Sequence, residues 1–199
     1  MNSLIKYFLK KILLITLLTP LFCCSQKPVF GIKLGLALSN STIEYANPGN
    51  DNSSKPSTRT GVLGGVYVDI PAAKKLIIRP GVEVVTKGAV LNEYGYSDHY
   101  SLRFTYVDFP INILYKANFI KGYLLAGGGP SIGVPIKEPY STYQLKPEFG
   151  INGLIGYEIP IGLSLNLNYN HGLSNASKSN DYVKKISNHY LGITVGYSF

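Results

Sequence analysis

Cysteine is almost absent from this 199-residue chain, and the two cysteines present, Cys23 and Cys24, are adjacent near its start. If residues 1–25 are removed, as their pattern predicts below, no cysteine is left. A chain without cysteine forms no disulfide and offers no thiolate to a metal ion. The sequence therefore excludes disulfide-stapled folds and cysteine-ligated metal sites for residues 26–199.

Long apolar runs are also missing, with one exception near the start. The run from Ile12 to Phe22 has about 11 residues, well short of the roughly 20 that a membrane-spanning helix needs. It is preceded by Lys6, Lys10 and Lys11 and followed by the small residues Cys23, Cys24 and Ser25. Charged, apolar and small residues in this order are typical of a secretory signal peptide. We predict a signal peptide over residues 1–25 and one domain over residues 26–199.

Two other interpretations of the first 25 residues stay open. The apolar run could be retained as a membrane anchor, although it is short for that purpose. Alternatively, the chain could be a lipoprotein acylated at Cys24, although Phe22 and Cys23 are unusual before a lipidated cysteine.

Charged residues are scarce too, at 15% of the chain. Removing residues 1–25 leaves 16 basic and 11 acidic residues, and this mild excess is spread along the sequence. A nucleic-acid-binding surface normally gathers lysine and arginine into a patch or stripe. We therefore expect no nucleic-acid partner.

Helical periodicity is absent after Gln26, and strict alternation takes its place. In the segment 163–170, Leu163, Leu165 and Leu167 alternate with serine and asparagine, as a strand with two different faces requires. Seven further segments alternate or are rich in glycine and apolar residues. The eight predicted strands cover residues 29–39, 60–70, 76–87, 103–116, 121–134, 148–159, 163–170 and 189–199. The phase of residues 121–134 is not fixed by the pattern.

The connections between these strands alternate in length. Short links follow the second, fourth and sixth strands, whereas residues 40–59, 88–102, 135–147 and 171–188 form longer segments rich in Ser, Asn, Gly, Pro and Tyr. Tight turns at one end and long polar loops at the other are the plan of an outer-membrane barrel. A soluble sandwich or a lipocalin-like barrel also alternates.

The composition of the two strand faces favours the membrane barrel. A soluble barrel keeps its apolar side chains inside, but here the face opposite the apolar residues consists of Gly, Ser and Asn with scattered charges, which suits a filled lumen. Tyrosine is frequent and tryptophan absent, and several tyrosines near strand ends suit an interfacial girdle, namely Tyr67, Tyr115, Tyr157, Tyr169 and Tyr197. We predict an all-β fold, an eight-stranded antiparallel up-and-down transmembrane β-barrel.

Several short motifs follow one another along the chain. They are "FGIKLGLALS", "GVLGGVYVDIP", "LIIRPGVEVVTKG", "YVDFPINILYK", "LLAGGGPSIG", Tyr169 with Gly172, Leu173 and Asn175, and the final "GYSF". This ordered set resembles the PorT-type outer-membrane β-barrel domain of Bacteroidota. The resemblance implies a barrel in the cell outer membrane, reached by export across the inner membrane. It also suggests an accessory role in a type IX-like protein-secretion or gliding system.

The predicted partners follow from this placement. They are outer-membrane lipid and the barrel-assembly machinery, for which the aromatic Phe199 resembles the C-terminal assembly signal of barrel proteins. Residues 40–59 and 171–188 are expected to present a surface to secretion components or extracellular ligands.

The inward faces carry a near-balanced set of charges. Four cations, Lys33, Arg79, Lys87 and Lys116, accompany five carboxylates, Asp69, Glu83, Asp108, Glu148 and Glu158. Because an unpartnered buried charge is costly, we expect ion pairs and amide hydrogen bonds to plug the lumen. The predicted lumenal polar network is Lys33, Arg79, Glu83, Lys87, Asp108, Asn112, Lys116, Asn152, Glu158, Asn166 and Asn168. A proton or ion path along Glu83 and Asp108 is the alternative.

No catalytic motif emerges from the sequence. His99, His171 and His189 lie in or beside loops, and "GGGPS" at 127–131 lacks the lysine of a phosphate-binding loop. A lipid-modifying enzyme is the alternative class, but outer-membrane acyltransferases carry an amphipathic helix ahead of the barrel, and here the first strand starts close to Gln26. We expect no enzymatic activity, no cofactor and no metal.

Overall fold

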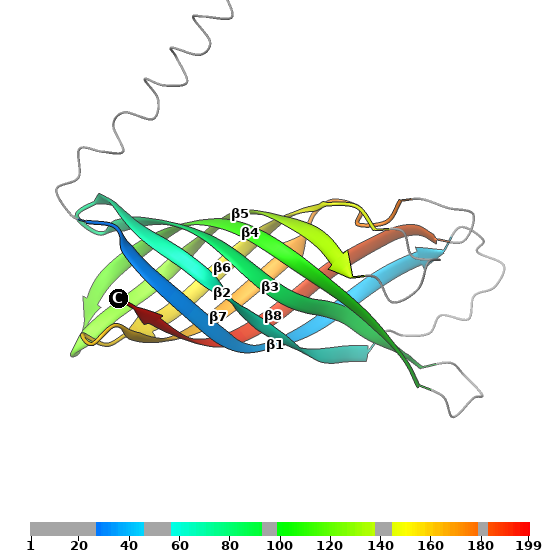
Figure 1. Ribbon diagram of the computed structural model, residues 1–199, viewed down its shortest axis with the longest axis horizontal. Coiled ribbons are helices and arrows are strands. Elements are labelled where there is room, and N and C mark those ends of the chain that lie inside the picture. Colours follow the sequence, from blue (N-terminus) through cyan, green and yellow to red (C-terminus); the bar gives the residue numbers. More distant parts are fainter. Residues whose placement is uncertain (1–26, 46–56, 93–98, 138–144, 179–182) are drawn as a thin grey trace, which may run out of the picture.

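The computed structural model describes residues 27–45, 57–92, 99–137, 145–178 and 183–199. All eight predicted strands occur, and they pair in chain order into one closed antiparallel barrel (Figure 1). They are β1 (Val29–Tyr45), β2 (Ser57–Ala73), β3 (Leu76–Asn92), β4 (His99–Phe119), β5 (Gly122–Lys137), β6 (Glu148–Glu158), β7 (Leu163–Gly172) and β8 (Val183–Ser198). The described part of the chain holds no helix able to cross a membrane. The predicted fold class is confirmed, while the signal peptide at 1–25 lies outside the described residues and stays a prediction.

The barrel closes where the first strand meets the last. β1 pairs with β8 from Gly31 opposite Ser198 to Tyr45 opposite Val183. Every strand therefore has two hydrogen-bonded neighbours, and no open edge remains in the sheet. The strands are strongly tilted against the long axis of the barrel (Figure 1).

The two ends of the barrel differ as the connection lengths predict. Residues 74–75, 120–121 and 159–162 make short turns at the end where the chain's last residue lies, here called the turn end (Figure 1). The opposite, loop end carries the long connections. Two residues of the turns have positive φ, Ile120 at 51° and Gly162 at 86°.

The predicted loops were too long at the loop end. β1 continues to Tyr45, β3 to Asn92 and β5 to Lys137, and β8 starts at Val183, so strand pairing extends into each of the four expected loop segments. The alternation ends where lipid no longer selects apolar side chains. The hydrogen-bond ladder does not need lipid and continues beyond that point.

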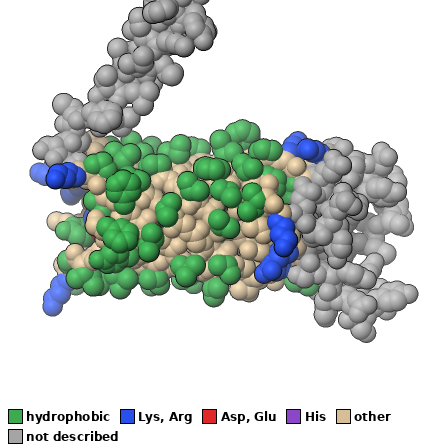
Figure 2. Space-filling model, in the orientation of Figure 1, with side chains coloured by type: hydrophobic (Ala, Val, Ile, Leu, Met, Phe, Trp, Pro, Cys, Tyr) green, Lys and Arg blue, Asp and Glu red, His purple; other side chains and the backbone are tan. Residues whose placement is uncertain are grey.

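The outward face of the barrel is an apolar band. Large apolar side chains such as Leu34, Val84 and Ile193 are exposed on it, and Figure 2 shows this band between basic side chains at the two ends. The structure also fixes the phase of β5, where Leu125 and Ser131 point inward and Leu124 and Ile132 outward.

A cysteine scan over three residues of β3 tests this facing. Val82 and Val84 are 43% and 48% exposed, whereas Glu83 between them is 4% exposed. Cysteines introduced singly at these positions are expected to react with a lipid-soluble thiol reagent at 82 and 84 and to resist it at 83, because successive strand residues point to opposite faces. Equal labelling at all three positions would contradict the assignment.

Candidate functional site in the barrel lumen

The structure places all eleven residues of the predicted lumenal network inside the barrel. Nine of them are buried, and Lys116 and Asn152 are half-buried. Buried charges persist in a protein only with partners, so the contacts of each cation decide what the site can do.

Arg79 and Asp69 form the most closely fitted ion pair. The guanidinium donates from Nε to Oδ1 at 2.6 Å and from Nη2 to Oδ2 at 2.7 Å, which is a bidentate arrangement. The Arg79 guanidinium also lies 4.2 Å from the centre of the Tyr67 ring. This pair, with its stacked aromatic ring, fills the lumen near the turn end.

Tyr67 corrects one sequence prediction. Expected in the interfacial girdle, it lies inside at 3% exposure, and its hydroxyl is 3.0 Å from Ser198 Oγ. Its ring occupies the space above Gly31, where a Cβ atom would overlap it. The other four girdle tyrosines lie on the outer face.

Lys33 reaches Glu83 across an intervening strand. Lys33 lies on β1 and Glu83 on β3, and Gly65 of β2 stands opposite both. The Lys33 Nζ to Glu83 Oε1 distance is 2.6 Å. A side chain at position 65 would crowd Glu83, because a Cβ there would lie 3.1 Å from Glu83 Cγ. The glycine thus creates the room that this ion pair uses.

Lys87 is the centre of a second charged group nearer the loop end. Its Nζ lies 2.9 Å from Asp108 Oδ2 and 3.7 Å from Glu148 Oε2. It also lies 4.5 Å from the centre of the Tyr106 ring. Glu148 in turn accepts hydrogen bonds from the backbone N–H and the side-chain amide of Asn188, at 3.1 and 3.2 Å. One lysine therefore joins two carboxylates from β4 and β6.

The fourth cation, Lys116, pairs with Glu158. Lys116 Nζ is 2.7 Å from Glu158 Oε1 and 4.4 Å from the centre of the Tyr123 ring. All four lumenal cations therefore have a carboxylate partner.

Asparagine side chains of β4, β6 and β7 form further hydrogen bonds in the lumen. Asn152 Nδ2 donates to Asn112 Oδ1 at 2.7 Å, and Asn170 Nδ2 donates to Asn152 Oδ1 at 3.0 Å. Further along, Asn168 Nδ2 donates to Thr194 Oγ1 at 3.0 Å and Asn166 Nδ2 to Ser164 Oγ at 3.1 Å. The polar side chains opposite Leu163, Leu165 and Leu167 therefore find hydrogen-bond partners inside the barrel.

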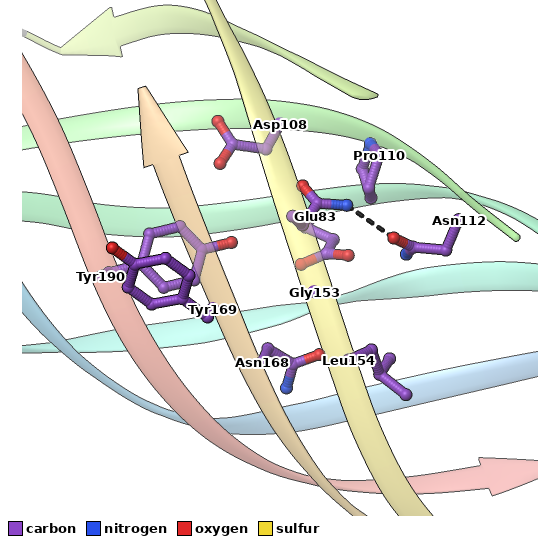
Figure 3. A pocket seen from close by; sticks show the side chains of 10 residues that line it. Glu83, Asp108, Pro110, Asn112, Gly153, Leu154, Asn168, Tyr169 and Tyr190 are labelled. Carbon is purple, nitrogen blue, oxygen red and sulfur yellow. Dashed lines mark hydrogen bonds between the residues drawn. The ribbon is translucent and has the colours of Figure 1, made fainter. Parts of the chain in front are cut away.

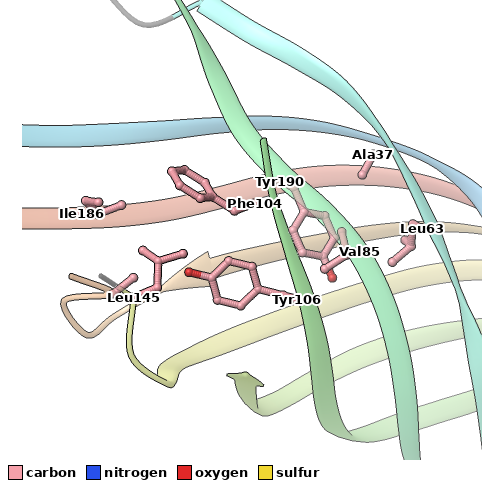
Figure 4. Close-up of a cluster of buried hydrophobic side chains, with 9 residues drawn as sticks. Ala37, Leu63, Val85, Phe104, Tyr106, Leu145, Ile186 and Tyr190 are labelled. Carbon is pink, nitrogen blue, oxygen red and sulfur yellow. The ribbon is translucent and has the colours of Figure 1, made fainter. Parts of the chain in front are cut away.

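Two clusters of buried apolar side chains share the lumen with this polar network, and the sequence pattern did not predict them. One lies toward the loop end (Figure 4) and contains Ala37, Leu63, Val85, Phe104, Tyr106, Leu145, Ala176, Ile186 and Tyr190. The other lies in the half nearer the turn end and contains Ile77, Leu114, Leu125 and Leu154. In the sequence, a single leucine on a polar face only interrupts the alternation. The clusters form because the register of the strands brings such residues from several strands together.

Residues 145–146 and 176–177, at the loop end, cover the first cluster. Leu145 bridges to Ser177, Lys146 N–H donates to the Ala176 carbonyl at 2.9 Å, and Ala176 N–H donates to the Ile186 carbonyl at 2.8 Å. Leu145 and Ala176 are both buried. These segments cover part of the mouth of the barrel.

The polar side chains of the lumen line a small cavity. It has a volume of about 10 Å³ and lies among Glu83, Asp108, Asn112, Asn168 and Tyr190 (Figure 3). A space of this size holds about one water molecule. Within the described residues, no group of three or more His, Cys, Asp or Glu side chains is arranged to hold a metal ion.

The three histidines and the C-terminal phenylalanine are not part of the predicted lumenal network. His171 and His189 face each other across β7 and β8, with ring centres 6.2 Å apart, and the side chain of His99 lies outside the described residues. Phe199 is exposed, and its N–H donates to the Phe30 carbonyl at 2.8 Å. Its role as an assembly signal stays a prediction.

A closed antiparallel barrel with an apolar exterior and a polar interior is typical of the class of outer-membrane β-barrel proteins. The chain belongs to the family described as outer membrane protein beta-barrel domain, whose model matches residues 25–178. The protein is located in the outer membrane. By the plan of such barrels, the turn end is periplasmic and the loop end extracellular.

Solved structures with the same fold have little sequence in common with this chain. The outer membrane protein OprG from Pseudomonas aeruginosa is 14% identical, with a TM-score of 0.53, over 87% of this chain and 97% of OprG. The outer membrane protein AlkL, determined by solid-state NMR in DMPC bilayers, is 11% identical, with a TM-score of 0.51, over 87% of this chain and 91% of AlkL. No curated protein matches the sequence. These similarities show the fold alone.

Proposed function

We propose that this protein is a closed barrel that acts as a structural or interaction platform through its extracellular connections. The observation that carries the proposal is the filled lumen, which holds four cations in five ion pairs, a network of asparagine side chains and two apolar clusters. An eight-stranded barrel has an interior only just wide enough for side chains. A barrel closed in this way transports nothing through its axis, so its contacts with partners lie at its ends.

The narrower assignment is to the PorT-type subgroup, and it is supported by the ordered motifs from "FGIKLGLALS" to "GYSF". The barrel is also proposed to be non-enzymatic. Incubation of the purified protein with labelled phospholipid is expected to give neither hydrolysis nor acyl transfer, and turnover above a heat-denatured control would overturn that part of the proposal.

Planar-bilayer recording tests the closed lumen. The purified protein is expected to show no stable, uniform conductance, because Arg79, Glu83, Lys87 and Tyr106 fill the axis. Reproducible channel steps that change when Glu83 is replaced by glutamine would contradict the proposal. They would favour an ion path along Glu83 and Asp108 instead.

A further inference from the structure

The periplasmic turns carry isoleucine at their tips. Ile120, between β4 and β5, is 84% exposed, and Ile161, between β6 and β7, is 68% exposed. Turn tips that meet water are normally built from Gly, Asn, Asp, Ser or Pro. Each of these two turns also places a large apolar side chain in the open, which the described part of the protein does not cover.

Ile120 also occupies an unfavourable backbone conformation. Its φ of 51° lies in the left-handed region, where a β-branched side chain is strained and glycine or asparagine is accommodated easily. Strained positions persist where the side chain gains something else. Because the Ile120 side chain is almost fully exposed, a compensating gain in free energy would come from its burial in a lipid or in another molecule.

The exposed charged side chains described around these tips are all basic. Lys27, Lys74, Lys75 and Lys121 are exposed at this end. Asp69 and Glu158, the acidic side chains described near it, are buried in the lumen with cationic partners. On the face shown in Figure 2, blue side chains lie at the end of the apolar band and no acidic side chain is visible.

The lysines stand next to the lipid-facing surface. Lys75 Nζ lies 5.8 Å from the centre of the ring of Tyr115, a tyrosine on the outer face. Lysine beyond an apolar and aromatic band is suited to place its ammonium at the level of the lipid phosphates.

We propose that the periplasmic end of the barrel is a binding surface for anionic phospholipids of the periplasmic leaflet. Ile120 and Ile161 enter the boundary between headgroups and acyl chains, and Lys74, Lys75 and Lys121 bind the phosphates. The surface continues the lipid-facing band, and its charge is complementary to these headgroups. This inference rests on the placement of the barrel in the membrane and is independent of the extracellular connections.

Tryptophan depth measurement tests the apolar half, because the chain has no tryptophan and a single substitution supplies the only indole. Ile120→Trp and Ile161→Trp, folded into vesicles of brominated phospholipids, are expected to be quenched by bromines near the headgroups more than by bromines near the chain ends. Val84→Trp, on the middle of β3, is the control for membrane insertion and should be quenched most by deep bromines. Tip tryptophans that escape quenching while Val84→Trp is quenched would overturn the proposal and favour a periplasmic protein as the occupant.

Lipid selectivity tests the charged half. In mixed phosphatidylglycerol and phosphatidylcholine vesicles, spin-labelled phosphatidylglycerol is expected to be enriched beside the protein, and the variant Lys74→Gln/Lys75→Gln/Lys121→Gln is expected to reduce that enrichment by at least about twofold at low salt. The matched control changes three exposed extracellular-side lysines, Lys137, Lys178 and Lys185, to glutamine. If the two triple variants lose the enrichment equally, or neither does, the phosphate contacts are not specific to the periplasmic end and the proposal fails.

Discussion

Replacing Arg79 with methionine is expected to lower the free energy of unfolding by about 3 to 5 kcal/mol. The substitution removes the bidentate partner of Asp69 and leaves its carboxylate buried, since the side chains of both residues are less than a tenth exposed. It also removes the guanidinium from the Tyr67 ring. Urea unfolding in lipid vesicles, followed by the gel shift between folded and heat-denatured barrel, measures the change.

A double substitution separates the loss of the pair from the burial of a lone charge. Asp69→Leu/Arg79→Met replaces both charges with apolar groups, and such replacements of buried pairs are often neutral or stabilising. We expect it to recover most of the stability lost in Arg79→Met. Lys178→Met, at an exposed position, is the control for removing a cation and should change little. A double variant as unstable as Arg79→Met would show that the loss does not come from the unpaired carboxylate.

Replacing Val84 with arginine is expected to cost about 2 to 4 kcal/mol, the range for a cation on the lipid face near the bilayer midplane. Val84 is central in β3 and 48% exposed on the outer surface. The same vesicle unfolding experiment gives the value.

The control for Val84→Arg keeps the position and removes the charge. Val84→Met preserves an apolar side chain and should be close to the parent protein, which separates the charge from any local packing effect. If the arginine is tolerated as well as the methionine, Val84 is not surrounded by lipid.

Alternation predicted the strands and the direction of most side chains because a bilayer requires the outward-facing side chains to be apolar. The leucines at 163, 165 and 167 point out and the asparagines at 166 and 168 point in, as their order in the sequence requires. The phase of β5 was not predicted because the adjacent Leu124 and Leu125 point to opposite faces and the glycines that follow mark neither face. The Tyr67 error has a similar origin, since tyrosine is suited equally to a membrane interface and to a stacked lumenal position.

The pairing of lumenal charges was not predictable from the sequence. Which cation meets which carboxylate depends on the register of neighbouring strands, and Lys33 reaches Glu83 only because Gly65 stands between them. The sequence showed that charges of both signs would be enclosed, but only the register shows that one lysine, Lys87, joins two carboxylates.

The seam between β1 and β8 bears on how the chain folds. It joins the two ends of the described chain, Gly31 to Ser198, so it can form only after the last strand has arrived. Until then the sheet has two open edges, whose unpaired amides and carbonyls are costly in hydrocarbon. The ion pairs of the lumen connect strands from β1 to β6 and contribute nothing to this last step. Closure therefore relies on contacts of the highest sequence separation, and such contacts make folding slow. Substitutions along β8 are consequently expected to change the rate of assembly more than those that break a lumenal ion pair.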